Sequence, residues 1–274
     1  MADFSPFIPS QTISILGCGW LGRPLAVALL RSGYDVNGST TSREKLRDLS
    51  AVGIRPYLIS FAPEVEGENI DAFFRSSVVV ICIPPGRATT ASTDYLMRLR
   101  CVCSELLKGG VKKVLFISST SVYRGKSGAV TETDADREST GFLAEEIFRQ
   151  NTSFDTTVIR FSGLVGPGRH PSRFLSGRTV SGGNDPVNLI HLDDCIGVIG
   201  TVIRRNFWNI DINACADAHP TRREFYHHVC VANGVPAPHF VPPDNDAPKI
   251  VSNKRLRDEL GYELKFPDPM TMTY

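Results

Sequence analysis

The stretch Thr12-Ile-Ser-Ile-Leu-Gly17-Cys-Gly-Trp-Leu-Gly22 decides the fold of this chain. It begins with a short β-rich run, turns at glycines, and continues to Leu30 with apolar residues at helical spacing. In this order of strand, turn and helix, G-x-G-x-x-G favours dinucleotide binding, because its glycines permit a tight turn, a close pyrophosphate and close helix packing. Without the strand and the helix, the same glycines would indicate only a turn. The sequence therefore predicts a dinucleotide site at Gly17, Gly19, Trp20, Leu21 and Gly22.

The alternation of strand and helix continues along the chain. The patterns predict strands at 34–39, 54–59, 77–83, 112–117 and 156–160, with helices at 43–49, 95–107 and 142–150. The strand at 77–83 is apolar on both faces, which is typical of a buried parallel strand. Right-handed crossovers between such strands give an α/β fold of the Rossmann type, a doubly wound parallel sheet that binds ligands at its carboxyl edge.

The composition changes to Gly, Pro, Arg and His between Gly163 and Pro186. We expect a Rossmann NAD(P)-binding domain at 1–162, with its sheet completed by strands within 187–213. The segments 163–186 and 214–274 are expected to form a small C-terminal substrate lobe. Two helix starts are predicted. Within 187–213, Asp193 or Asp194 can cap a helix that ends near residue 204, and within 214–274 the stretch Thr221-Arg-Arg-Glu224 fits a capping box.

Composition excludes several classes of protein. Thirty Lys and Arg against 29 Asp and Glu give a formal charge of +1, which argues against nucleic-acid binding. The seven cysteines contain no C-x-x-C pair and describe neither a metal site nor a disulfide framework. The longest apolar run, residues 78–83, is far shorter than the roughly 20 residues of a membrane span. Since residues 1–9 also lack signal-peptide features, we expect a cytoplasmic protein without a membrane partner.

The end of the strand at 34–39 bears on the choice of cofactor. An NAD site usually carries Asp or Glu at this place, where the chain has Thr40. The hydroxyls and positive charge of Thr40, Thr41, Ser42 and Arg43 suit the 2′-phosphate of NADP, although NAD is not excluded. In the alternative interpretation, Ser42 only caps the next helix and Arg43 lies on its solvated face. Ile83 and Pro84 end the strand at 77–83 and are expected to lie against the cofactor, or simply to end the strand.

Three motifs together resemble the extended short-chain dehydrogenase/reductases of the epimerase/dehydratase type. They are the glycine motif, Ser118-Ser-Thr-Ser-Val-Tyr123 and Asn188-Leu-Ile-His-Leu-Asp-Asp194. Within that superfamily, Gly163-Leu-Val-Gly-Pro-Gly-Arg-His-Pro171 and Ala218-His-Pro-Thr-Arg222 are most similar to the atypical YeeZ-like group. The resemblance covers nearly the whole chain, and it implies a Rossmann fold with an NAD(P) site.

The chain departs from this superfamily at the catalytic residues. Catalytic members use a Ser or Thr together with Tyr-x-x-x-Lys, in which the Tyr is the acid or base and the Lys lowers its pKa. Here Ser119 stands at the Ser/Thr position, but residues 124–150 contain no tyrosine, and their only lysine is Lys126. Tyr123 lies in the preceding turn, so we expect it to shape that turn rather than to catalyse.

Other residues can supply the chemistry. We expect Ser119 and Thr120 to hydrogen-bond the reacting oxygen and His170 to act as acid or base. Arg169 and Arg173 would bind an anionic substrate, and His219 and Arg222 can join them. Alternatively, His170 and His219 are ordinary residues before Pro171 and Pro220. We interpret His191 as a structural histidine at the start of a helix.

Two functions therefore stay open at this point. The first is an NADP-dependent oxidoreductase, or an epimerase/dehydratase-like enzyme, that acts on a small polar anionic substrate as a monomer or homodimer. The second is a non-catalytic NADP-binding regulatory or scaffold protein, which the missing Tyr-x-x-x-Lys pair favours. The hydroxyls of 118–121 and the Arg/His cluster favour the enzyme.

Overall fold

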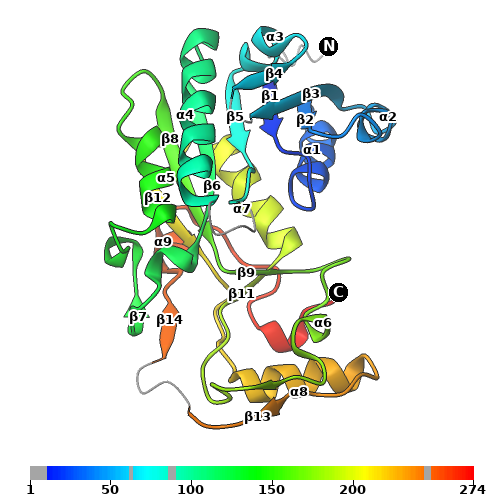
Figure 1. Ribbon diagram of the computed structural model, residues 1–274, viewed down its shortest axis with the longest axis vertical. Coiled ribbons are helices and arrows are strands. Elements are labelled where there is room, and N and C mark those ends of the chain that lie inside the picture. The colour runs from blue at the N-terminus through cyan, green and yellow to red at the C-terminus, as the bar shows by residue number, and fades with distance from the viewer. Residues whose placement is uncertain (1–10, 62–63, 86–90, 244–247) are drawn as a thin grey trace, which may run out of the picture. The chain divides into compact units, whose positions relative to one another are not determined.

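The computed structural model describes residues 11–61, 64–85, 91–243 and 248–274, and its largest sheet has eight strands (Figure 1). The strand order is β12-β8-β6-β5-β1-β2-β3-β4. The strands are β1 (Thr12–Leu16), β2 (Asp35–Thr40), β3 (Arg55–Phe61), β4 (Val65–Gly67), β5 (Val78–Ile81), β6 (Lys113–Ser119), β8 (Asp155–Phe161) and β12 (Asp211–Ala214). The strand order reverses between β1 and β5, as in a doubly wound sheet. The predicted α/β Rossmann fold is confirmed.

The chain divides into two compact units. Unit 1 comprises residues 1–116 and 147–156, and unit 2 comprises residues 117–146 and 157–274. This division follows compactness alone, so the predicted functional domains at 1–162, 163–186 and 214–274 stay predictions. Residues 1–9, where signal-peptide features are lacking, lie outside the described residues. None of the helices in the described ranges combines the length and the apolar character that crossing a membrane requires.

Unit 1 is built around the buried strands β1 and β5. Every residue of β5 is completely buried, as are Ile13 and Ile15 of β1, because helices cover both faces of a parallel sheet. Full burial of one such aliphatic side chain stabilises the fold by about 1.5–3 kcal/mol. Helix α1 turns Leu25, Ala26 and Leu29 inward. The helices of this unit are α1 (Gly22–Arg31), α2 (Lys45–Ser50), α3 (Ile70–Phe74) and α4 (Ala91–Gly109).

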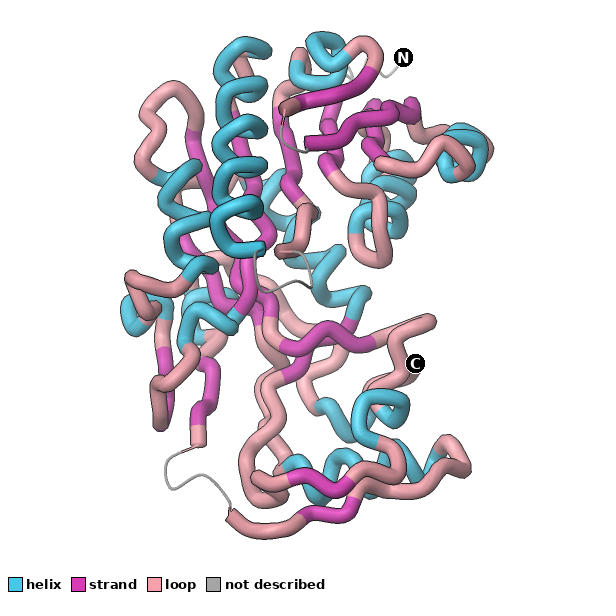
Figure 2. The backbone as a smooth tube through the Cα atoms, viewed as in Figure 1, coloured by secondary structure: helices cyan, strands magenta, loops and turns pink. Residues whose placement is uncertain are grey.

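Unit 2 joins the end of the main sheet to short elements separated by long loops, which Figure 2 shows as magenta and cyan pieces in a pink tube. Three two-stranded ladders pair β7 (Gly128–Val130) with β14 (Lys249–Val251), β9 (Gly163–Val165) with β11 (Leu189–His191), and β10 (Thr179–Val180) with β13 (His239–Phe240). The helices are α6 (Ser172–Leu175), α7 (Leu192–Arg205), α8 (Arg222–Ala232) and α9 (Lys254–Asp258), while α5 (Thr140–Arg149) ends in unit 1. Three short 3-10 turns are η1 (Thr120–Tyr123), η2 (Glu132–Asp134) and η3 (Pro269–Thr271).

Two details differ from the sequence-based predictions. Of the strands expected within 187–213 to complete the main sheet, β12 joins it, whereas β11 pairs with β9 in a separate two-stranded sheet. Helix α7 is capped by His191, whose Nδ1 accepts from the Asp193 amide at 3.1 Å, and not by Asp193 or Asp194. Asp194 is buried and instead accepts hydrogen bonds from the amides of Lys265 and Phe266. The capping box at Thr221 and Glu224 is confirmed.

Candidate functional site

The glycine loop has the geometry that a bound pyrophosphate needs. Gly17 has a φ of +103°, and a Cβ there would lie 2.9 Å from the Cys82 carbonyl oxygen. A Cβ at Gly22 would overlap the carbonyl oxygen of Gly17, so only glycine lets helix α1 begin this close to β1. At Gly19, by contrast, a Cβ would meet nothing within 4 Å. The backbone is thus tightly packed at the first and third glycines and open at the second, where a phosphate must approach.

Strand β2 holds this loop in place. The amide of Gly17 donates to Ser39 Oγ at 2.9 Å, and the amide of Cys18 donates to the Ser39 carbonyl at 2.8 Å. Within the described residues, no side chain caps α1, and no acidic residue occupies its first turn. The positive end of the helix dipole therefore faces no protein carboxylate in that turn, which suits an anionic ligand. Trp20 is half-buried and Leu21 is buried. These residues fit a dinucleotide.

The residues expected at the 2′-phosphate follow β2. Thr40 is buried, and its Oγ1 accepts a hydrogen bond from the Ser42 amide at 3.2 Å, whereas Thr41 and Arg43 are exposed. Helix α2 begins at Lys45 with Glu44 as its N-cap and has no side-chain capping bond. The Ser42 side chain therefore does not cap α2, and Ser42 and Arg43 belong to the loop.

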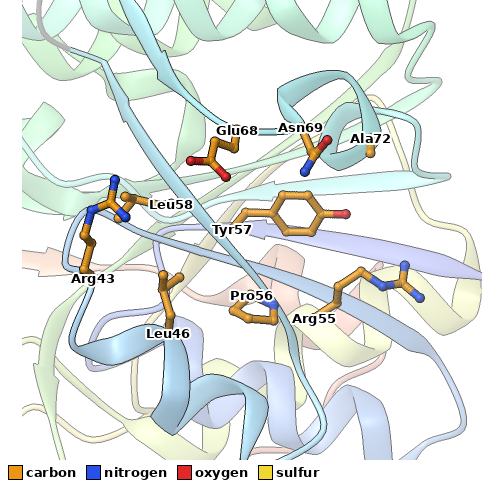
Figure 3. A pocket seen from close by; sticks show the side chains of 9 residues that line it. All are labelled: Arg43, Leu46, Arg55, Pro56, Tyr57, Leu58, Glu68, Asn69 and Ala72. Carbon is orange, nitrogen blue, oxygen red and sulfur yellow. The ribbon is translucent and has the colours of Figure 1, made fainter.

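Arg43 also lines a pocket of about 340 Å³ in unit 1. Figure 3 shows Arg43 at one end of this pocket and Arg55 at the other, with Tyr57 between them. The remaining lining residues are Leu46, Pro56, Leu58, Glu68, Asn69 and Ala72. At the end of β5, Ile83 is half-buried and its carbonyl accepts from Tyr95 Oη at 3.1 Å, while Pro84 is exposed.

In unit 2, the hydroxyl run at the end of β6 divides into buried and exposed members. Ser118 donates to Glu145 Oε1 at 2.6 Å. Ser119 is exposed, and its Oγ caps the turn η1 by accepting from the Ser121 amide at 3.2 Å. Thr120 is buried. Of Ser119 and Thr120, the two predicted to bind the reacting oxygen, Ser119 has the hydroxyl that a small molecule can reach.

Tyr123 is completely buried within unit 2. Its Oη donates to Asn213 Oδ1 at 2.7 Å and accepts from Arg160 Nη1 at 2.8 Å. Burial raises the pKa of Tyr123 to about 12, which opposes ionisation near neutral pH. These contacts leave Tyr123 in a structural position at the turn and out of reach of a substrate.

Sequence reasoning missed the buried cation next to Tyr123. Arg160 is fully buried and forms a bidentate pair with Glu145, at 2.9 Å from Nε to Oε1 and 2.6 Å from Nη2 to Oε2. A further contact of 3.3 Å reaches Asp211 Oδ2, and Nη1 donates to the Glu132 carbonyl. The spacing between these residues shows no local pattern, so only the fold reveals the pair.

The loop after β9 carries the candidate acid or base. His170 is half-buried, and its Nδ1 accepts from the Ser172 amide at 3.2 Å, which leaves the proton of the neutral ring on Nε2. Burial and then the positive charge of Arg173 lower the pKa of His170. The ring packs on Tyr274 with a centroid distance of 4.7 Å. Arg169 and Arg173 are both exposed in this loop.

The other cationic candidates have structural contacts. His219 Nδ1 donates to the Val187 carbonyl at 3.0 Å. Arg222 Nη1 donates to the carbonyls of Ser181 and Gly182 at 2.8 and 3.3 Å. Each side chain thus holds a loop, and a substrate role for either stays a prediction. In the described ranges, no three His, Cys, Asp or Glu side chains gather as metal ligands do.

Comparison with known proteins gives a family model and a sequence relative, together with structures of the same fold. Residues 12–99 match the family model described as NADP oxidoreductase coenzyme F420-dependent. Protein YeeZ from Escherichia coli K12 is 36% identical to the chain over 272 residues, which cover 96% of the chain and 98% of the relative.

Two solved structures share the fold. One is a short-chain dehydrogenase/reductase superfamily protein from Agrobacterium tumefaciens with bound NAD, with a TM-score of 0.76 at 19% identity over 94% of both chains. The other is UDP-glucuronic acid 4-epimerase from Bacillus cereus in complex with UDP-glucuronic acid and NAD. Its TM-score is 0.75 at 19% identity, over 94% of this chain and 95% of the epimerase. The fold predicted from the resemblance is therefore confirmed.

Proposed function

The chain belongs to the family of Protein YeeZ, and we propose that it is an NADP-dependent enzyme, either an oxidoreductase or an epimerase/dehydratase-like enzyme. The observation that carries the proposal is the glycine loop, whose backbone is packed at Gly17 and Gly22 and open at Gly19. Solved relatives of the same fold bind NAD. The nicotinamide group supplies or accepts a hydride when bound. The loop residues, together with Thr40, Ile83 and Pro84, would hold the dinucleotide cofactor.

The preference for NADP over NAD rests on the loop between β2 and α2. Thr40 introduces no carboxylate that would repel a 2′-phosphate, and Arg43 is an exposed cation just before α2. Thr41 and Ser42 add hydroxyl donors. Since Ser42 does not cap the helix, its side chain is available to a ligand.

The substrate in this proposal is a small polar anion. Arg169 and Arg173 are exposed cations on the loop that follows β9, and they would bind its negative charge. Ser119 offers an exposed hydroxyl to the reacting oxygen, with Thr120 beside it. His170 is neutral near pH 7 because its pKa is lowered, so it can accept a proton. The Bacillus cereus epimerase acts on a UDP-sugar, an anion of this general kind.

A second candidate function is a non-catalytic NADP-binding regulatory or scaffold protein. It is favoured by the buried position of Tyr123, which cannot replace the missing Tyr-x-x-x-Lys pair. The exposed Ser119 and the cationic loop at 169–173 favour the enzyme, since a scaffold has no need of them. Turnover of any carbonyl or hydroxyl compound would decide for the enzyme.

Calorimetric titration with NADPH and NADH tests the cofactor assignment. We expect micromolar NADPH binding and much weaker NADH binding by protein freed of copurified nucleotide. Arg43→Ala should weaken NADPH binding about 10–100-fold, since a charge-assisted hydrogen bond contributes about 1.5–3 kcal/mol. NADH binding should stay unchanged. The matched control is Arg47→Ala, which removes an exposed cation of the following helix α2.

Two outcomes would contradict the proposal at different levels. Equal losses of NADPH and NADH affinity in Arg43→Ala would end the assignment of Arg43 to the 2′-phosphate. Folded, nucleotide-free protein that binds neither cofactor would end both candidate functions together, because the enzyme and the scaffold depend on the same glycine loop.

A further inference from the structure

A lysine from the C-terminal part of the chain lies on the turn that carries Ser119. Lys249 is the first residue of β14, which pairs with β7 in parallel register. Asn188 fixes the backbone of this strand at two points: its Nδ2 donates to the Lys249 carbonyl at 2.9 Å, and its Oδ1 accepts from the Val251 amide at 2.8 Å. The position of Lys249 is therefore set by a side chain from the motif at 188–194.

The Lys249 side chain reaches the turn η1. Its Nζ donates to the Thr120 carbonyl at 3.2 Å and lies 5.9 Å from the centroid of the Tyr123 ring. The side chain is half-buried, so the ammonium is partly withdrawn from water and partly accessible. The amino group is thereby held at the carbonyl of Thr120, the residue that follows the exposed Ser119 in the sequence.

Within the part of the chain that the structure describes, no carboxylate pairs with this group. Among the described residues, Thr120 is the hydrogen-bond partner of Nζ, and no Asp or Glu forms an ion pair with it. The groups that face it are the neutral Tyr123 ring and the cation Arg124 from the turn, while β7 and Asn188 contribute no charge. Burial and then the charge of Arg124 lower the pKa of Lys249. It can therefore release a proton more readily than an exposed lysine.

Helix α5 packs closely on the turn at Gly141. A Cβ at Gly141, in the first turn of this helix, would lie 2.8 Å from Val122 Cγ1. The helix backbone thus packs directly on η1 at this point. The amine that contacts the turn comes from β14.

We propose that Lys249 is a catalytic residue of this protein, donating a hydrogen bond and then a proton to the substrate oxygen held by Ser119. This role rests on the proposed enzymatic function. Lys249 would thereby place beside Ser119 the ammonium that the missing Tyr-x-x-x-Lys pair does not supply.

The proton transfer balances in the direction of carbonyl reduction. The carbonyl carbon is reduced by the hydride that a dihydronicotinamide supplies, and the cofactor is oxidised. The carbonyl oxygen takes the π electron pair and forms a new O–H bond with a proton from Lys249. The N–H bond breaks, its electron pair stays on Nζ, and the neutral amine regains a proton from water. In the oxidative direction, the neutral amine accepts the alcohol proton.

The first test measures the titration of Lys249 directly and needs no turnover. Reductive methylation with 13C-formaldehyde labels the eight lysines, and Lys249→Arg identifies the signal of Lys249 by its loss. We expect the Lys249 signal to titrate at a lower pH than the signals of the exposed lysines. A midpoint among those of the exposed lysines would overturn the proposal.

The second test measures reduction of phenanthrenequinone, an activated dicarbonyl, by NADPH across a pH series. Lys249→Met should lower kcat about 100-fold or more, as expected on loss of a general acid. Lys249→Arg keeps the charge and a donor to the Thr120 carbonyl, but it should lose the fall of kcat at alkaline pH. A residue that only braces the turn would leave that pH profile unchanged. Lys254→Met, which removes an exposed lysine after the same strand, is the control and should behave as wild type.

The outcomes separate this assignment from the proposed function. Wild-type protein that leaves NADPH unoxidised ends the oxidoreductase form of the proposed function, and the role of Lys249 in carbonyl reduction ends with it. An active wild type together with an equally active Lys249→Met variant overturns only the role of Lys249. Circular dichroism checks the fold of each variant, and if Lys249→Met does not fold, the pH profile of Lys249→Arg decides.

Discussion

The loop at residues 17–22 and the turn at residues 118–123 each follow a strand of the main sheet, but they use their backbone and side chains in opposite ways. The loop leaves space at Gly19, where nothing lies within 4 Å of a Cβ position. The turn buries its most polarisable group, because Tyr123 is enclosed by Asn213 and Arg160. The glycine loop thus keeps its backbone open at Gly19. In the turn, by contrast, the Tyr123 hydroxyl is part of a buried hydrogen-bond network.

This contrast shows which property each region depends on. The loop depends on glycines that have no side chain, so adding a Cβ to one of them should change either NADPH binding or the packing of α1 on β1. The turn works through paired buried groups, so removing one partner should change stability. Variants in the two regions should therefore have separable effects on NADPH affinity and on the free energy of unfolding.

The largest effect is expected at Arg160. Arg160→Met leaves Glu145 buried without its cation, and breaking a buried ion pair in this way costs about 3–5 kcal/mol. Urea denaturation measures the loss. The control is Arg257→Met, because Arg257 forms an exposed pair with Asp217 at 3.7 Å that should contribute at most about 1 kcal/mol. Similar losses in both variants would show that the buried network around Tyr123 contributes no more to the free energy of unfolding than an exposed ion pair does.

The next effect separates two glycines of the loop. Gly22→Ala places a Cβ on the Gly17 carbonyl oxygen and should destabilise the protein by about 1–3 kcal/mol, as overpacking does. Gly19→Ala meets no protein atom and should leave stability unchanged, but it should weaken NADPH binding by about 10-fold or more. Thermal unfolding and calorimetry report the two quantities. Unchanged NADPH affinity in Gly19→Ala would mean that no phosphate approaches there.

Much of this contrast could be predicted from the sequence, and the reason is distance along the chain. The glycine loop lies in one segment with its strand and helix, so spacing alone predicts it. Arg160 with Glu145, and Lys249 with Thr120, come together only through the fold. No spacing rule points to either pair.

Short elements were missed for a related reason. Strand β4 and helix α3 are three and five residues long, too short for a period to show. Helix α7 was assigned an aspartate cap because Asp is a common cap, but the His191 ring accepts the Asp193 amide, and Asp194 is used by the amides of Lys265 and Phe266. The helix thus uses neither of the two aspartates that the local pattern favoured, because a histidine caps it and tertiary hydrogen bonds engage Asp194.

A smaller effect should follow from removing one hydroxyl in the turn. Tyr123→Phe leaves Asn213 and Arg160 each short of one hydrogen-bond partner and should cost about 1–3 kcal/mol. Because Tyr123 is buried and its pKa is raised to about 12, we expect the turnover rate and its pH profile to stay unchanged. Urea denaturation and steady-state kinetics measure both. A stably folded variant that turns over about 100-fold more slowly than wild type would make Tyr123 a catalytic residue after all.

The smallest effect concerns His170, whose pKa is lowered by burial and by Arg173. Since the folded state binds the proton less tightly than the unfolded chain, this histidine costs no stability above the unfolded pKa of about 6.5. As the pH falls through that value, protonation favours the unfolded chain and stability is lost. His170→Gln should therefore lose less stability than wild type between pH 7.5 and 5.5, by urea denaturation, whereas His228→Gln, on the exposed face of α8, should follow wild type. Identical curves for His170→Gln and wild type would mean that His170 stays solvated, and its burial beside Tyr274 would then contribute nothing to its acid–base behaviour.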